Sequence, residues 1–211
     1  MRYNIKEKAI EIKSYAKVNI GLNIIDRLSN GYHKIETLIQ EINFYDTITI
    51  EISLEEGGID FSSTGNRINC ENKKNSCYLI LQLLKEKYHI LNKIKIHLHK
   101  NISIGAGVGG GSGNAGSILN FIDYYFNLKM SIGEKTDVCQ TIGMDVPFFI
   151  NGKLQYAENM GEKLTLLPNL FTSYYFLLVY PEIKISTQWA YANIKKQLPV
   201  KKLNYNLLAL K

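Results

Sequence analysis

The sequence of 211 residues has few of the features that mark disulfide frameworks, zinc sites or membrane spans. Its three cysteines, Cys70, Cys77 and Cys139, lack Cys-x-x-Cys spacing, which argues against a disulfide framework and a zinc site and favours a reducing compartment. Its most apolar run, residues 174–180, is too short to cross a bilayer. The N-terminal segment has no apolar signal-peptide core, so we expect a cytoplasmic protein without membrane contact.

Only four prolines occur, and hydrophobic residues make up 45% of the chain, which excludes disordered and collagen-like proteins. The net charge is +6 and the pI about 9.0. All but three of the 25 basic residues are lysines, and no arginine-rich stripe appears, so we do not expect nucleic-acid binding. A small anionic ligand fits this charge better, but a codon bias toward Lys, Asn and Ile would explain it equally well.

Apolar and polar residues alternate in several segments of the first 150 residues. This alternation predicts strands at residues 9–25, 34–42, 46–54 and 93–99. Helical spacing predicts helices at residues 76–89, 112–126 and 131–142. We expect Asn75 to cap the first of these helices and Gly143 to end the last one in a left-handed conformation.

The pattern of predicted elements changes after residue 152. Short strands are predicted at residues 153–158, 163–167 and 174–180, and a helix at residues 187–197 opened by Ser186 or Thr187. Strands, then helices, then strands again favour an α+β fold over a repeating βαβ series. We therefore expect one domain over residues 1–150 and an incomplete second domain over residues 151–211.

The most informative segment is residues 105–116, in which seven of twelve residues are glycine. Glycine is costly to order, so such a run needs a physical reason. Without Cβ atoms, several backbone N–H groups can converge on one anion, and the following helix adds its unpaired donors and positive dipole end. Ser112 adds a hydroxyl group. The segment therefore predicts a phosphate-binding loop.

Three other interpretations compete for this loop. Gly105, Gly107 and Gly110 fit the G-x-G-x-x-G spacing of dinucleotide-binding proteins, with Asp123 as the ribose-binding acid. That reading requires a parallel sheet. A Walker A loop is excluded because Gly111 occupies the place of its lysine. A flexible linker is disfavoured because a helix follows at once.

Three more segments carry residues that could act in catalysis or binding, although an ordinary structural role would also explain each of them. Lys17 and Asn19 share the polar face of the first long strand, about 6–7 Å apart, where a lysine is usually solvated. Asp145 is placed to cap a short helix that has Pro147 in its first turn. The run Gly-Tyr-His at residues 31–33 is placed to form a hairpin turn.

Taken in order, the motifs AKVN, GYH, GAGVGGGS-x-NA and G-x-DVPFF resemble those of the GHMP family of small-molecule kinases. The resemblance implies a GHMP kinase fold, with an S5-like N-terminal α/β domain followed by a ferredoxin-like C-terminal domain. It implies ATP and Mg²⁺ as cofactors. The GYH and DVPFF motifs resemble the branch that phosphorylates a small-molecule cytidyl diphosphate substrate in isoprenoid precursor synthesis.

The resemblance also implies roles for individual residues. Lys17 and Asp145 match the catalytic pair. Four residues match the substrate site: Asn19, Tyr32, His33 and Tyr191. Eight residues match the ATP site: Asn75, Lys100, Gly105, Gly107, Gly109, Gly110, Gly111 and Ser112. The resemblance implies no metal ligand among these residues.

The chain departs from the family pattern at several places. Ser103 stands where the family usually has proline, Gly113 replaces a serine, and Ser76 and Cys77 replace an apolar pair beside Asn75. Family members continue well past residue 211, which predicts an incomplete second domain whose exposed apolar surface is covered by self-association or a partner. The alternative hypothesis is a weak or inactive nucleotide-binding remnant.

Overall fold

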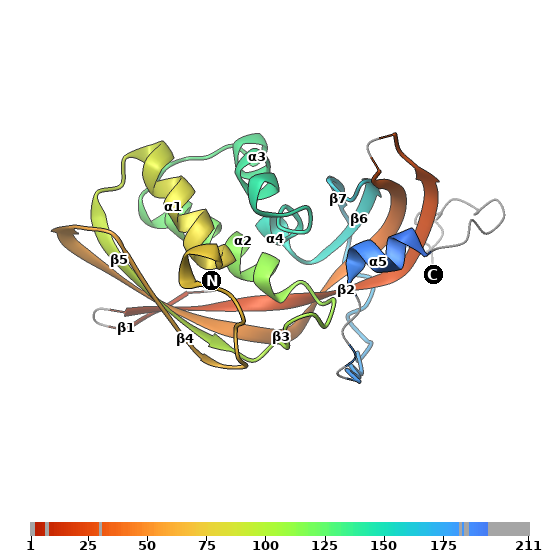
Figure 1. Cartoon of the computed structure of the whole chain (residues 1–211), viewed down its shortest axis with the longest axis horizontal. Coiled ribbons are helices and arrows are strands. Elements are labelled where there is room, and N and C mark those ends of the chain that lie inside the picture. Colours follow the sequence, from red (N-terminus) through yellow and green to blue (C-terminus); the bar gives the residue numbers. More distant parts are fainter. Residues whose placement is uncertain (1–2, 7–8, 30, 182, 184–185, 194–211) are drawn as a thin grey trace.

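The computed structural model describes residues 3–6, 9–29, 31–181, 183 and 186–193. Its strands are β1 (Tyr3–Lys6), β2 (Ala9–Arg27), β3 (His33–Glu56), β4 (Ile59–Gly65), β5 (Asn92–Lys100), β6 (Leu154–Asn159) and β7 (Lys163–Leu166). Its helices are the 3₁₀ turn η1 (Asn72–Lys74), α1 (Ser76–Tyr88), α2 (Gly110–Tyr125), α3 (Ile132–Ile142), α4 (Phe148–Asn151) and α5 (Thr187–Ala192). Figure 1 shows α1, α2 and α3 lying on one side of the sheet.

The sheet is organised around β2 and β3, which form one long antiparallel hairpin. The second half of β3 pairs with β5, whereas its first half pairs with β6, so the sheet divides along β3. The strand order is β1-β2-β3-β5-β4, and β6 with β7 lies beside the first half of β3. Of these pairings only β4 with β5 is parallel.

The main core lies between this sheet and the helices. It contains fully buried apolar side chains from β3, β5, α1 and α2, among them Ile48, Ile50, Ile94, Ile96, Ile80, Leu81, Leu84, Ile118, Leu119 and Ile122. A smaller cluster joins Phe148 and Phe149 of α4 to Ile39 and Ala157 of the sheet. Helix α4 therefore packs on the sheet near the point along β3 at which the pairing partner changes from β6 to β5.

Most of the predicted elements are confirmed. The side chain of Asn75 caps α1 by accepting from the backbone N–H of Cys77 at 2.9 Å. Ser131 and Glu134 form a capping box at the start of α3. The runs at 34–42 and 46–54 are one continuous strand, β3, which pairs with β2 between His33 and Ile50.

Three expectations are wrong. Gly143 has a φ of 172°, which is extended backbone and not a left-handed cap. The residue before α4 is Pro147, so Asp145 does not cap that helix. Residues 174–180 form no strand, and exposed side chains of Tyr175 and Leu177 line that segment. Strands β1 and β4 were not predicted from the sequence.

The segment after residue 150 continues the first sheet through β6 and β7. The division into residues 1–150 and 151–211 stays a prediction. Helix α5 is opened by Ser186, whose hydroxyl accepts from the N–H of Trp189 at 3.0 Å. Residues 194–197 of the predicted helix lie outside the described residues.

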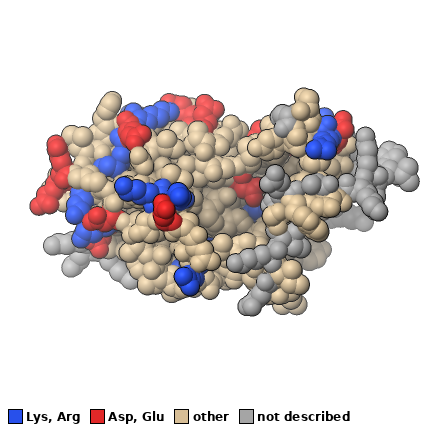
Figure 2. All heavy atoms as spheres, in the orientation of Figure 1, with Lys and Arg blue, Asp and Glu red and all other residues tan. Residues whose placement is uncertain are grey.

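Within the described part of the chain, no helix has the length and apolar character needed to span a membrane. On the face shown in Figure 2, Lys and Arg side chains are interspersed with Asp and Glu instead of gathering into one basic patch.

Candidate active site

Lys17 follows an irregularity in the pairing of β2 with β3, in which residues 43 and 44 of β3 have no partner on β2. The register between β2 and β3 shifts between Tyr15 and Ala16. Ala16 and Lys17, the first residues after this shift, are both buried, although alternation would place one of them on the open face. A β-bulge re-aims side chains in this way. The backbone N–H of Lys17 donates to Val108 O at 2.9 Å, which ties β2 to the glycine-rich loop.

The ammonium group of Lys17 meets the carboxylate of Asp145, with 3.2 Å between Nζ and Oδ2. Nζ also donates to Asn19 Oδ1 at 2.7 Å, and Asn19 Nδ2 donates to Thr37 Oγ1 at 3.2 Å. The Lys17 side chain is 8% exposed, whereas that of Asp145 is 53% exposed. The lysine is therefore held in place while the carboxylate stays open to a substrate. Thr37, fully buried on β3, was not predicted to contribute.

The glycine-rich loop begins α2 beside this pair. Gly105, Gly107 and Gly109 have φ values of 84°, 74° and 71°, which side chains rarely adopt. A Cβ atom at Gly109 would also lie 3.0 Å from Lys17 Cγ. Because Gly109 immediately precedes α2, the unpaired N–H groups and positive end of this helix lie next to Lys17.

At two later positions glycine is needed because neighbouring elements pack closely, and not because an anion binds there. A Cβ atom at Gly113 would lie 2.7 Å from Tyr15 O, and one at Gly116 would lie 2.6 Å from Phe149 Cβ. Both distances are shorter than real Cβ contacts, so α2 approaches β2 and α4 this closely only with glycine. The prediction that the whole run binds phosphate did not include this second cause.

A cavity of about 300 Å³ opens beside the loop. Loop residues 103–111, Lys100 and the first residues of α1, Asn75 and Ser76, line it. Ser76 Oγ donates to Gly111 O at 2.8 Å and so joins the starts of α1 and α2. All predicted ATP-site residues except Ser112 line this cavity; Ser112 lies in the first turn of α2.

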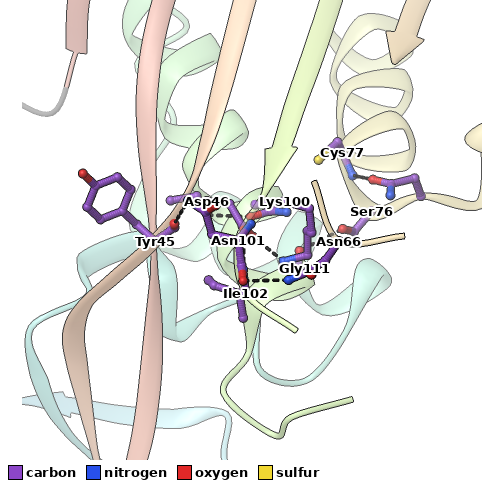
Figure 3. A network of polar contacts seen from close by, with 12 residues as sticks. Tyr45, Asp46, Asn66, Ser76, Cys77, Lys100, Asn101, Ile102 and Gly111 are labelled. Atoms are coloured by element: carbon purple, nitrogen blue, oxygen red, sulfur yellow. Dashed lines mark hydrogen bonds and ion pairs between the residues drawn. The ribbon is translucent and has the colours of Figure 1, made fainter. Parts of the chain in front are cut away.

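Lys100 is fixed by a buried partner that sequence reasoning missed. Its ammonium group forms an ion pair with Asp46, which is fully buried (Figure 3). The other carboxylate oxygen, Asp46 Oδ1, accepts from the backbone N–H groups of Asn101 and Ile102, both at 2.8 Å. Lys100 Nζ lies 2.7 Å from where a Cβ of Gly110 would be, so this charge sits at the start of α2.

Two of the aromatic residues assigned to the substrate, His33 and Tyr191, form a stacked pair near Asp145. His33 and Tyr191 are stacked, with ring centroids 5.0 Å apart and planes inclined by 25°. Burial, and secondly the charge of Asp145, raise the pKa of Tyr191, which places this ring near the carboxylate. Tyr32 is 54% exposed at the hairpin turn that the sequence predicted.

The geometry does not support the dinucleotide-binding alternative. Strand β5, which precedes the loop, is antiparallel to β3. Asp123 forms an ion pair with Lys135 at 2.7 Å and accepts from the N–H of Met130 at 3.0 Å, so it is not a free ribose ligand.

Comparisons with known proteins show which family this chain is similar to. Residues 75–153 match the family described as GHMP kinases N terminal domain. A 4-diphosphocytidyl-2-C-methyl-D-erythritol kinase of Sulfurihydrogenibium sp. is 33% identical over 195 residues, which cover 92% of this chain and 69% of that relative. The chain belongs to the GHMP kinase family. The expected α+β class and GHMP kinase fold are thereby confirmed.

One further relative and two solved structures are also similar to this GHMP kinase chain. The enzyme of the same name from Caldicellulosiruptor saccharolyticus is 37% identical over 85% of this chain, but the chain spans only 61% of that relative. A crystal structure of 4-(cytidine 5'-diphospho)-2C-methyl-D-erythritol kinase has a TM-score of 0.65 at 30% identity, covering 74% of this chain and 55% of that one. Homoserine kinase from Cytophaga hutchinsonii, at 16% identity, shares the fold with a TM-score of 0.63 over 94% of this chain and 64% of that one.

Proposed function

We propose that this chain transfers the γ-phosphoryl group of ATP to the C2 hydroxyl group of 4-diphosphocytidyl-2-C-methyl-D-erythritol, in the non-mevalonate route to isoprenoid precursors. The observation that carries the proposal is the Lys17–Asp145 pair beside the N-terminus of α2. The names of the relatives supply the substrate.

The cavity beside the loop is suited to the nucleotide. The N–H groups at the start of α2 and the positive end of that helix would bind the phosphates. Lys100 adds a cationic charge at the same end of the helix and is prevented from moving by Asp46. Asn75 and Ser76 line the cavity from α1, where we place the adenosine.

Asp145 and Lys17 are suited to the transfer step. Phosphoryl transfer depends mainly on positioning and on stabilising the charge of the transferred group. In our proposal an oxygen of Asp145 accepts the proton of the substrate hydroxyl, and Lys17 offsets negative charge on the γ-phosphoryl oxygens. Asn19 holds Lys17 through Oδ1 and keeps one amide hydrogen for the methylerythritol end of the substrate.

The cytosine is proposed to bind at His33, Tyr32 and Tyr191. His33 and Tyr191 now stack directly on each other, so a base inserted between them requires their ring centroids to move apart. Stacking of a base on an aromatic ring contributes about 1–3 kcal/mol, which would offset the loss of the ring pair. We therefore expect α5, which carries Tyr191, to shift when the substrate binds.

The donor groups present fit a magnesium ion that is held mainly by the nucleotide. Among the described residues, no three His, Cys, Asp or Glu side chains gather into a metal site. Mg²⁺ typically takes one or two carboxylates together with substrate phosphates and waters. The exposed carboxylate of Asp145 would be the protein ligand nearest the phosphates. When bound, the ion would neutralise phosphate charge.

The proposal is tested by ADP release in a coupled assay, with ATP alone, with the cytidyl substrate, and with 2-C-methyl-D-erythritol 4-phosphate, which lacks the cytidyl group. We expect ADP release only with the cytidyl substrate. ATP binding without substrate-dependent ADP release would instead support the inactive remnant. The ordered Lys17–Asp145 pair favours the active kinase over that remnant.

We also propose self-association through the exposed apolar side chains of residues 174–179. Tyr175 and Leu177 are 102% and 91% exposed, and contiguous apolar surface of this kind is typical of interfaces. Sedimentation velocity should show a dimer or larger species that Leu177→Glu dissociates; a wild-type monomer would contradict this proposal.

A further inference from the structure

A second cavity lies at the other end of α2, away from the glycine-rich loop. Its volume is about 810 Å³. It is lined by the last turns of α2, by the connection to α3 and by the segment after α4, with the residues Asn120, Asp123, Tyr124, Tyr125, Asn127, Lys129, Lys135, Ile150, Asn151 and Lys153. The proposed kinase reaction uses none of these residues.

Three of the lining residues are lysines, against one aspartate. Lys135 is 13% exposed and is held by Asp123 at 2.7 Å and by Asn120 Oδ1 at 3.2 Å. An ammonium group has three donors, so one donor of Lys135 remains for a ligand. Lys129 and Lys153 are exposed and form no ion pair with any residue that the structure describes.

The backbone at this cavity is also unusual. Five non-glycine residues of the described chain have positive φ, and three of them, Asn127, Lys129 and Lys153, line the cavity. Their φ values are 51°, 57° and 63°. Lysine seldom adopts this conformation, and strained backbone of this kind concentrates at ligand sites.

We propose that this cavity binds a small phosphorylated metabolite through Lys129, Lys135 and Lys153. A phosphate or diphosphate group accepts charge-assisted hydrogen bonds from ammonium groups. The exposed rings of Tyr124 and Tyr125 provide apolar surface for the rest of the molecule.

Contacts link this cavity to the candidate active site. Asn120, which binds Lys135, also donates from Nδ2 to Phe149 O at 3.3 Å and to Ile150 O at 2.9 Å. The Phe149 side chain packs against Gly109, which precedes α2, and against Gly113 and Gly116 of α2.

The site is tested by titrating the chain with inorganic diphosphate and with orthophosphate in a calorimeter. Diphosphate should bind more tightly than orthophosphate, because it can engage lysines from different segments. The variant Lys129→Ala/Lys153→Ala should weaken diphosphate binding by about tenfold or more. The matched control Lys93→Ala/Lys95→Ala removes the same charge from β5 and should leave that affinity unchanged.

Three results would overturn the site. The first is no binding of either probe up to about 10 mM. The second is equal affinity in the Lys129→Ala/Lys153→Ala variant, which would place the diphosphate at the glycine-rich loop. The third is a loss of thermal stability in that variant with unchanged affinity, which would mean that the lysines only neutralise the carbonyl end of α2. The binding readout does not depend on kinase activity, and Lys129→Gln/Lys153→Gln replaces the alanine variant if that one does not fold.

Discussion

Lys17 Nζ and Asp145 Oδ2 lie 3.2 Å apart although β2 and the turn before α4 are distant in the sequence. Three features bring them together: the irregularity at Tyr15 and Ala16, the bond from the Lys17 N–H to Val108 O, and the packing of Phe149 on α2. The pair is therefore a product of the core and not of one flexible loop.

Asp145→Asn should lower turnover by at least about 100-fold while ATP-analogue affinity stays within a few-fold of wild type. General-base catalysis contributes roughly 10²–10⁴ in rate, and an amide cannot accept the hydroxyl proton. Steady-state ADP release and analogue titration measure the two quantities. Asp137→Asn, an exposed acid on α3, is the control and should be fully active. Near-wild-type turnover by Asp145→Asn would show that Asp145 is not the general base.

Asp46→Asn should lower the free energy of unfolding by about 3–5 kcal/mol, because it leaves Lys100 buried without its counter-charge. Asp46→Asn/Lys100→Met should lose less than the sum of the two single variants. Urea unfolding of all four proteins gives this comparison. Asp60→Asn, which breaks the exposed pair with Lys93 at 3.1 Å, should cost less than about 1 kcal/mol. If the loss of unfolding free energy in the double variant equals the sum of the losses in the two single variants, the two buried charges do not stabilise each other.

Gly116→Ala should destabilise the fold by about 1–3 kcal/mol, although alanine is the better helix former. The new methyl group would lie 2.6 Å from Phe149 Cβ, which cannot move without shifting α4. Gly133→Ala on α3 is the matched control, because its nearest neighbour is 3.9 Å away. Thermal unfolding should show a loss of stability for Gly116→Ala. For Gly133→Ala it should show no change in stability or a gain of up to about 1 kcal/mol. A gain at both positions would refute the packing role of Gly116.

Stability should fall as the pH rises above about 8.5, where cysteine thiols titrate in the unfolded chain. Burial raises the pKa of both Cys77 and Cys139 to about 12. Because these thiols stay protonated in the folded chain and ionise in the unfolded one, ionisation favours unfolding over this range. Each thiol should contribute a loss of about 1 kcal/mol between pH 8 and 9.5.

Urea unfolding under reducing conditions measures that slope. Cys77→Ala/Cys139→Ala is less stable overall because it loses buried side-chain volume, but its stability should change less with pH. A slope equal to that of the wild type would exclude the thiols as its cause.

Local sequence patterns predicted most of the elements and the composition of the site. Period-two alternation identified β2, β3 and β5, helical spacing identified α1 and α3, and Asn75 marked the start of α1, because these signals are complete within short windows. The motif order identified the family, and with it the residues around the loop. The pattern failed at Gly143 and at residues 174–180, where backbone conformation depends on neighbours that the window does not contain.

One missed feature left a readable signal. Alternate residues of a strand share one face. Asp46 therefore shares a face with Ile48 and Ile50, and Lys100 shares a face with Ile96 and Leu98, so each charged residue lies on the apolar face of its strand. Two opposite charges on core faces predict a buried pair. Only the register between β3 and β5 decides that they meet.

The sequence alone determined that this chain has a strand with Lys17, a glycine-rich turn into a helix, and an acid ahead of a short apolar helix. Tertiary structure decided that Lys17, beside the irregular pairing of β2 with β3, meets Asp145, that Gly113 and Gly116 serve packing, and that Asp46 holds Lys100. The reason is physical: alternation and capping are set by neighbouring residues, whereas register, bulges and close approach are set by the packing of segments far apart in the chain.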